Sequence, residues 1–142
     1  MNVFLDANVL ISVVNKEQPL FSYSSRILSL AGNPKFILYT SAVWLAITYY
    51  FSEKKSGNNS ALVKIKLLAD HIQTAPVTHR EVLAATLNKS IHDFEDGLQY
   101  YAALHAGCTC IVTENITDFY FSEIEVIDCK TFFSKYMTDK KS

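Results

Sequence analysis

The chain has 142 residues, of which 49% are hydrophobic, and this size suits a single domain over residues 1–142. Its net charge of −1 excludes a general electrostatic attraction to nucleic acid, so any contact with phosphate needs a local basic patch or a bound cation. No apolar run reaches the length of about 18 residues that a membrane span needs. The three cysteines include no CxxC pair, which favours a reduced, cytoplasmic protein.

The first half of the chain alternates strand-like and helix-like patterns. Pro19 suits the first turn of a helix, and Gly32 is a typical helix end. Thr40 and Ser41 are residues of the N-cap type, and they precede an apolar helix. In chain order we predict a strand at 3–5, helices at 8–15 and 19–31, a strand at 36–39, a helix at 42–51 and a polar loop at 52–60.

The second half continues the alternation. We predict a helix at 61–73, an edge strand at 75–77, helices at 80–88 and 93–106, strands at 110–112 and 126–127, and a last helix at 130–136. Helices that alternate with short apolar strands are typical of a mostly parallel sheet covered on both faces. The predicted fold class is therefore α/β, with a central parallel sheet between two helical layers.

Aspartates follow two of the predicted strands. Asp6 ends the first strand, and Asp118 follows the strand at 110–112 after a short loop. Because open α/β sheets build their sites at the carboxyl ends of strands, we expect these carboxylates to lie at one edge. Asp93 and Asp96 begin the helix at 93–106 and add two more acids. Carboxylates held this close repel each other, so the pattern favours a divalent cation such as Mg²⁺ or Mn²⁺ among them.

Each acid also has a purely structural interpretation. Asp6 and Asp93 stand where helix N-caps are expected, and aspartate is a favoured cap. Asp118 lies in a loop, where aspartate is a common turn residue. The four histidines lack the spacing of a zinc site, and the lysines near residues 54–66 suit either a solvated helix face or a phosphate-binding rim.

Three segments of the sequence resemble the PIN domain family. Residues 4–10 (FLDANVL), 93–99 (DFEDGLQ) and 113–119 (TENITDF) are similar to its opening motif, its acidic helix and its closing motif, in the same order. The resemblance implies a three-layer α/β/α fold and metal-dependent cleavage of RNA, often by the toxin half of a VapBC-type toxin–antitoxin pair. It also implies that Asp6, Asp96 and Asp118 hold Mg²⁺ or Mn²⁺, with Asp93 beside them.

The chemistry of the residues agrees with this resemblance. A cation held by carboxylates can activate water and offset the charge that develops when a phosphodiester is hydrolysed. Three neutral residues have supporting roles in this hypothesis. Asn8 caps the first helix and reaches the site, Thr113 hydrogen-bonds a metal-binding carboxylate, and Asn115 supplies an oxygen or orients a water molecule.

The sequence departs from the PIN pattern at one position. Related domains commonly carry a glutamate on the helix after the second strand, and this chain has Ile47 there. An alkyl side chain cannot bind a metal, so Thr48 or Asp93 would have to replace the missing oxygen. A degenerate domain that binds RNA or a protein partner without catalysis is therefore the alternative. A phosphate-accepting receiver-type domain is disfavoured because paired acids are missing after the first strand.

Partners are expected from the resemblance and from the aromatic content. A toxin of this kind acts on RNA and pairs with an antitoxin protein. The helices at 19–31 and 42–51 carry more aromatic residues than one small core is expected to absorb, which predicts a homodimer.

Overall fold

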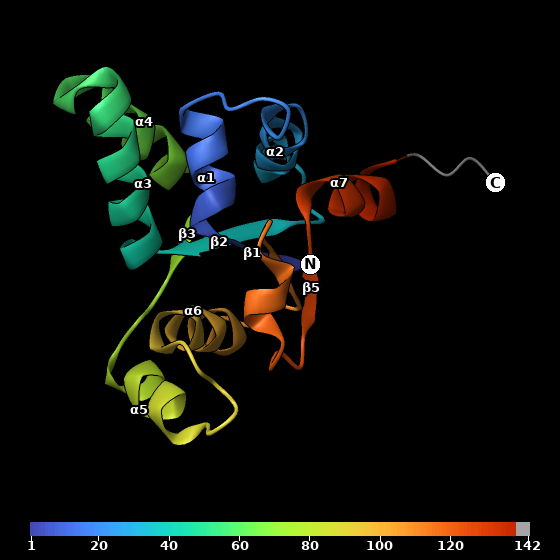
Figure 1. The fold of residues 1–142 in the computed structure, drawn as a ribbon. Helices are drawn as coiled ribbons and strands as arrows, with labels where there is room; N and C mark the ends of the chain where they lie inside the picture. Colours follow the sequence, from blue (N-terminus) through green and yellow to red (C-terminus); the bar gives the residue numbers. More distant parts are fainter. Residues whose placement is uncertain (139–142) are drawn as a thin grey trace.

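The computed structural model describes residues 1–138 and has a parallel five-stranded sheet at its centre (Figure 1). Its strands lie in the order β3-β2-β1-β4-β5, and every neighbouring pair is parallel. The strands are β1 (Asn2–Leu5), β2 (Ile37–Ser41), β3 (Gln73–Ala75), β4 (Cys110–Val112) and β5 (Glu125–Ile127). The sheet order reverses direction at β1, so the carboxyl ends of β1 and β4 flank the point where such folds place a ligand.

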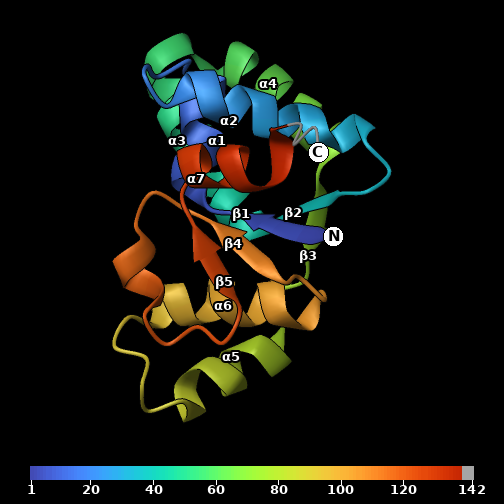
Figure 2. The same cartoon turned by 90° about the vertical axis from the view of Figure 1, so that its right-hand side faces the viewer.

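Helices cover both faces of this sheet and complete the predicted three-layer α/β/α fold (Figures 1 and 2). One layer consists of α1 (Ala7–Val14), α2 (Phe21–Leu28), α3 (Ala42–Ser56), α4 (Asn58–His71) and α7 (Cys129–Phe132). The opposite layer consists of α5 (His79–Leu87) and α6 (Phe94–His105). Shorter helical turns are η1 (Ser29–Gly32), η2 (Ile116–Phe119) and η3 (Phe133–Met137).

Two apolar clusters fill the space between the layers. Val3 and Leu5 of β1 face the cluster beneath α1 and α2, whereas Phe4 between them faces the cluster over α6. All three side chains are fully buried. This alternation follows from the two-residue period of a strand, and it fixes which face of the sheet each helix covers. Asp6 is the next residue, so the strand delivers it to the sheet edge.

The predicted polar loop at 52–60 is wrong. Helix α3 continues to Ser56, and α4 begins at Asn58 after a single intervening residue. That residue is Gly57, whose φ of 82° lies in the region that glycine adopts without strain. Lys54 and Lys55 stand in the last turn of α3, where positive charge interacts favourably with the helix dipole. The polar composition of the segment reflects an exposed helix end and a sharp turn.

Other differences from the predicted elements are small. The edge strand β3 occupies Gln73–Ala75 and not 75–77, and the helix predicted at 19–31 is divided into α2 and η1. The last predicted helix, at 130–136, is the short α7 followed by η3. Among residues 1–138, no helix combines the length and the apolar character needed to cross a membrane.

Candidate metal centre

Two neighbouring parallel strands bring Asp6 and Thr113 side by side. Leu5 of β1 pairs in register with Val112 of β4, and the Asp6 backbone N–H donates to the Val112 carbonyl at 3.0 Å. The residue after each strand therefore lies at the same edge of the sheet. Asp6 is buried, with 6% of its surface exposed, and Thr113 is fully buried.

A hydrogen-bond network fixes the orientation of the Asp6 carboxylate. Its Oδ2 accepts from the Thr113 hydroxyl at 2.6 Å and from Asn8 Nδ2 at 3.2 Å, while its Oδ1 accepts from the Ala7 backbone N–H at 2.9 Å. Asn8 also donates to Thr113 Oγ1 at 3.2 Å, and its Oδ1 accepts from the Glu114 backbone N–H. The predicted contact of Thr113 with a carboxylate is thus present, and Asp6, not Asn8, caps α1.

Helix α6 brings Asp96 to this edge from the opposite helical layer. Asp96 stands in the first turn of α6, and Asp93 is the N-cap, with Oδ1 accepting from the backbone N–H groups of Glu95 and Asp96. A Cβ added to Gly97 would lie 2.9 Å from Ile91 Cγ2 and 3.3 Å from Ala85 Cβ. The absence of a side chain at residue 97 therefore allows this turn to pack closely against its neighbours.

The loop after β4 supplies Asn115 and Asp118. The Asn115 backbone N–H donates to Thr113 Oγ1 at 3.0 Å, and the Asp118 backbone N–H donates to the Asn115 carbonyl at 3.0 Å. Asp118 lies in the 3₁₀ turn η2, and Phe119 beside it is buried in the core. The buried phenylalanine anchors the turn, so the adjacent carboxylate has a defined place.

Residues from these segments line one cavity of about 250 Å³. Its lining is Asp6, Ala7, Asn8, Ile11, Trp44, Glu95, Asp96, Asn115 and Asp118. The three predicted metal-binding aspartates thus meet at one cavity. A larger cavity of about 420 Å³ lies beside Phe36, Tyr39 and His71 and has no carboxylate in its lining, so its chemistry does not suit a hard cation.

The carboxylates in the cavity perturb one another. Burial raises the pKa of Asp96 to about 7, with further contributions from the negative charges of Asp93, Asp118 and Asp6. Burial also raises the pKa of Asp6, although its hydrogen bonds from Thr113, Ala7 and Asn8 act in the opposite direction. Such shifts mean that the cation-free cavity disfavours full ionisation, and that a cation bound there would relieve the repulsion.

The oxygen donors of this cavity suit a hard divalent cation. Within residues 1–138, no three carboxylate, imidazole or thiol side chains already form a compact ligand set. Mg²⁺ usually keeps several water ligands and takes only one or two carboxylates directly, so it does not require a compact set of three. We therefore expect Asp6, Asp96 and Asp118 to hold such an ion partly through water molecules.

Four of the residues singled out in the sequence lie outside the cavity lining, namely Ile47, Thr48, Asp93 and Thr113. Asp93 is exposed and serves as the cap of α6, although its charge reaches Asp96. Ile47 is half-buried and packs against the apolar cluster that contains Trp44. In their place, the lining includes Glu95 and Trp44, which the sequence analysis did not propose for the site. The one feature of the sequence that points to Glu95 as a site residue is its position next to Asp96.

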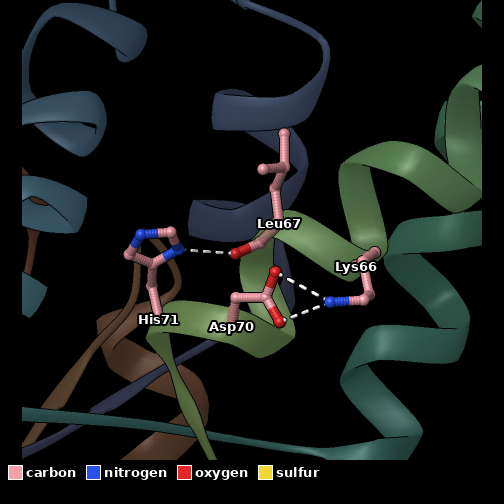
Figure 3. Close-up of polar contacts among 4 residues, drawn as sticks. All are labelled: Lys66, Leu67, Asp70 and His71. Atoms are coloured by element: carbon pink, nitrogen blue, oxygen red, sulfur yellow. Dashed lines mark hydrogen bonds and ion pairs between the residues drawn. The ribbon is translucent and has the colours of Figure 1, made fainter.

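Helix α4 illustrates the ordinary roles of polar residues away from the cavity (Figure 3). Lys66 Nζ pairs with Asp70 Oδ1 at 2.7 Å, one helical turn along, and His71 Nδ1 contacts the Leu67 carbonyl at 2.8 Å. The exposed pair fits the predicted solvated helix face. His71 is exposed, and its ring contacts the backbone of its own helix.

A parallel sheet between helical layers, with aspartates converging at the carboxyl ends of β1 and β4, defines a class of α/β protein suited to metal-assisted chemistry. Comparison with known proteins identifies the family. The family model described as PIN domain matches residues 2–117, and the chain belongs to this family.

Individual relatives agree with this assignment. The chain is 31% identical over 140 residues to Ribonuclease VapC1 of Aquifex aeolicus (strain VF5), covering 96% of each chain. Among solved structures, it is similar to VapBC2 from Rickettsia felis bound to a DNA fragment from their promoter, with a TM-score of 0.69, 18% identity and coverage of 90% and 98%. It is also similar to VapBC-1 from nontypeable Haemophilus influenzae, with a TM-score of 0.68, 20% identity and coverage of 92% and 99%.

Proposed function

We propose that this protein is a metal-dependent ribonuclease of the VapC toxin type, which hydrolyses phosphodiester bonds of RNA. The observation that carries the proposal is the convergence of Asp6, Asp96 and Asp118, from three separate segments, on one cavity. Membership of the PIN domain family and the 31% identity to a ribonuclease support the same activity. Mg²⁺ or Mn²⁺ is the cofactor whose ligand preference this donor set matches.

The chain's own residues prepare the site for this reaction. Thr113, Asn8 and the Ala7 backbone hold both oxygens of Asp6 in place, so this carboxylate needs little rearrangement to bind a cation. A bound divalent cation supplies the positive charge that activates water and stabilises a transferring phosphoryl group. Asp96 and Asp118 face the same cavity, where Asn115 offers a neutral group that can orient a water molecule.

The alternative function is a PIN domain that binds RNA or a protein without cutting. Ile47 favours this non-catalytic alternative, because the apolar residue replaces a glutamate common in the family and leaves the site with one carboxylate fewer. The two functions differ in one measurable property. A binding domain would retain RNA without turnover, whereas a nuclease would release shortened RNA only when Mg²⁺ or Mn²⁺ is supplied.

Two protein partners belong to the same proposal. The VapBC relatives support an antitoxin as one partner. A second copy of this chain is the other, and exposed apolar side chains on α3 and α4 support it. Tyr50 and Phe51 are 50% and 44% exposed on α3, and Leu62 and Val63 are 52% and 61% exposed on α4. Apolar surface of this kind is typical of contact sites between proteins.

An RNase assay with a metal titration tests the proposed activity. Purified protein is incubated with a fluorescent RNA at increasing Mn²⁺ and, in parallel, with EDTA. We expect cleavage that depends on Mn²⁺ and is lost in Asp6→Asn, while Asp70→Asn on the exposed face of α4 keeps full activity. Cleavage that persists in EDTA, or that survives Asp6→Asn, would exclude this cavity as the active site.

A further inference from the structure

Glu95 has no assigned role in the site, yet it lines the same cavity as Asp6, Asp96 and Asp118. We infer that Glu95 is the additional metal-binding carboxylate of this protein and replaces the acid that Ile47 displaces from helix α3. The inference rests on the proposed metal-dependent function, and it concerns which residue completes the donor set.

Three features of Glu95 support this role. It stands in the first turn of α6, directly before Asp96, and both residues line the cavity. Its side chain is exposed, and among residues 1–138 no hydrogen-bond donor or cation pairs with its carboxylate. A glutamate side chain is also long and flexible enough to move toward an ion that arrives in the cavity.

The other candidates for the missing oxygen are less well placed. Asp93 Oδ1 already accepts two backbone N–H groups as the cap of α6, and Asp93 is not among the residues that line the cavity. Thr48 is fully buried, and its hydroxyl donates to the Trp44 carbonyl at 2.7 Å. Helix α3 therefore contributes only the apolar surface of Trp44 to the lining. Of these candidates, only Glu95 combines a free carboxylate with a place at the cavity.

The test compares two variants that each remove one negative charge from the start of α6. Glu95→Gln removes the proposed ligand, and Asp93→Asn is the matched control because asparagine is an equally good N-cap. Both charges act on Asp96, and Asp93 contributes more to its raised pKa than Glu95 does. A purely electrostatic role would therefore make Asp93→Asn at least as harmful as Glu95→Gln.

Calorimetric titration with Mn²⁺ gives the affinity, and water proton relaxation gives the number of water molecules on the bound ion. We expect Glu95→Gln to weaken Mn²⁺ binding by about tenfold or more, as loss of a metal-orienting group typically does, and to add about one bound water. We expect Asp93→Asn to weaken binding by only about two- to threefold, the effect of an exposed charge.

The outcomes separate this inference from the proposed function. Equal losses in the two variants, or an unchanged water count in Glu95→Gln, would overturn the role of Glu95 even if Asp96→Asn abolishes binding. The proposed metal centre and the role of Glu95 would fail together if the wild-type protein bound no Mn²⁺.

Discussion

Replacing Asp96 with asparagine should stabilise the metal-free protein. The pKa of Asp96 is raised to about 7, above its ordinary value of 3.8, mainly by burial and then by Asp93 and Asp118. Without solvent screening, this difference in pKa corresponds to a free-energy cost of about 4 kcal/mol for ionising Asp96 in the folded protein. Because Asp96 is only half-buried, solvent screening reduces the effect to about 1–2 kcal/mol. For a chain of 142 residues, this raises Tm by about 3–8 °C.

The pH dependence gives the sign of the effect. The folded protein keeps the Asp96 proton up to about pH 7, whereas the unfolded chain releases it near the ordinary value of 3.8. Between these values the folded state binds more protons, so its stability falls as pH rises. The stabilising effect of Asp96→Asn should therefore be full at pH 8 and absent at about pH 4.

Calorimetric melting at pH 8 and pH 4, with and without Mn²⁺, measures both parts of this prediction. Wild-type protein should gain about 2.7 kcal/mol when Mn²⁺ is present at about 100 times its Kd, and Asp96→Asn should gain little. Asp70→Asn is the control, because it removes an exposed aspartate that pairs with Lys66 on the same helix, away from the cavity. The reasoning is refuted if Asp96→Asn melts below wild type at pH 8, or if Mn²⁺ raises both Tm values equally.

Three further predictions follow from the packing and the surface. Gly97→Ala should weaken Mn²⁺ binding and lower stability by about 1–3 kcal/mol, because the Cβ of the new alanine would lie 2.9 Å from Ile91. Adding Ile91→Ala in a double variant should restore Mn²⁺ binding. Gly32→Ala is the control and should have little effect in calorimetry, because a Cβ at residue 32 would have no neighbour within 4 Å. Ile47→Glu should lower the stability of the metal-free protein, by up to about 1.5–3 kcal/mol for lost burial, yet tighten Mn²⁺ binding; destabilisation without a gain in affinity would make Ile47 an ordinary core residue. Light scattering should give a particle of twice the 16.0 kDa chain mass, and a single-chain mass across a wide concentration range would contradict the homodimer.

The sequence was most informative where one element determines the position of a residue. The strand β1 alternates Val3, Phe4 and Leu5 between the two faces and then ends at Asp6, so the place of this carboxylate follows from local periodicity. The sequence predicts only that Thr113 hydrogen-bonds a metal-binding carboxylate, and the structure identifies this partner as Asp6. Parallel neighbouring strands end at the same edge, and their pairing brings the next residues together.

Features that depend on packing between elements were not predictable in this way. Which acid at the start of α6 reaches the cavity depends on how the helix is rotated about its axis and on its packing against other segments, such as the close approach of Gly97 to Ile91 and Ala85. Neither contact is visible in the local pattern, so Asp93 was preferred and Glu95 was overlooked. The helices joined at Gly57 were missed because polar residues at an exposed helix end resemble a loop.

The central claim is that Asp6, Asp96 and Asp118 together hold a divalent cation. Crystals of the protein soaked in Mn²⁺ and measured for anomalous scattering would test it most directly. We predict a peak inside the cavity bounded by these three residues, with at least one carboxylate oxygen at about 2.1 Å, and no such peak in crystals of Asp96→Asn. An empty cavity at saturating Mn²⁺, or a peak elsewhere on the molecule that Asp96→Asn leaves unchanged, would contradict the claim.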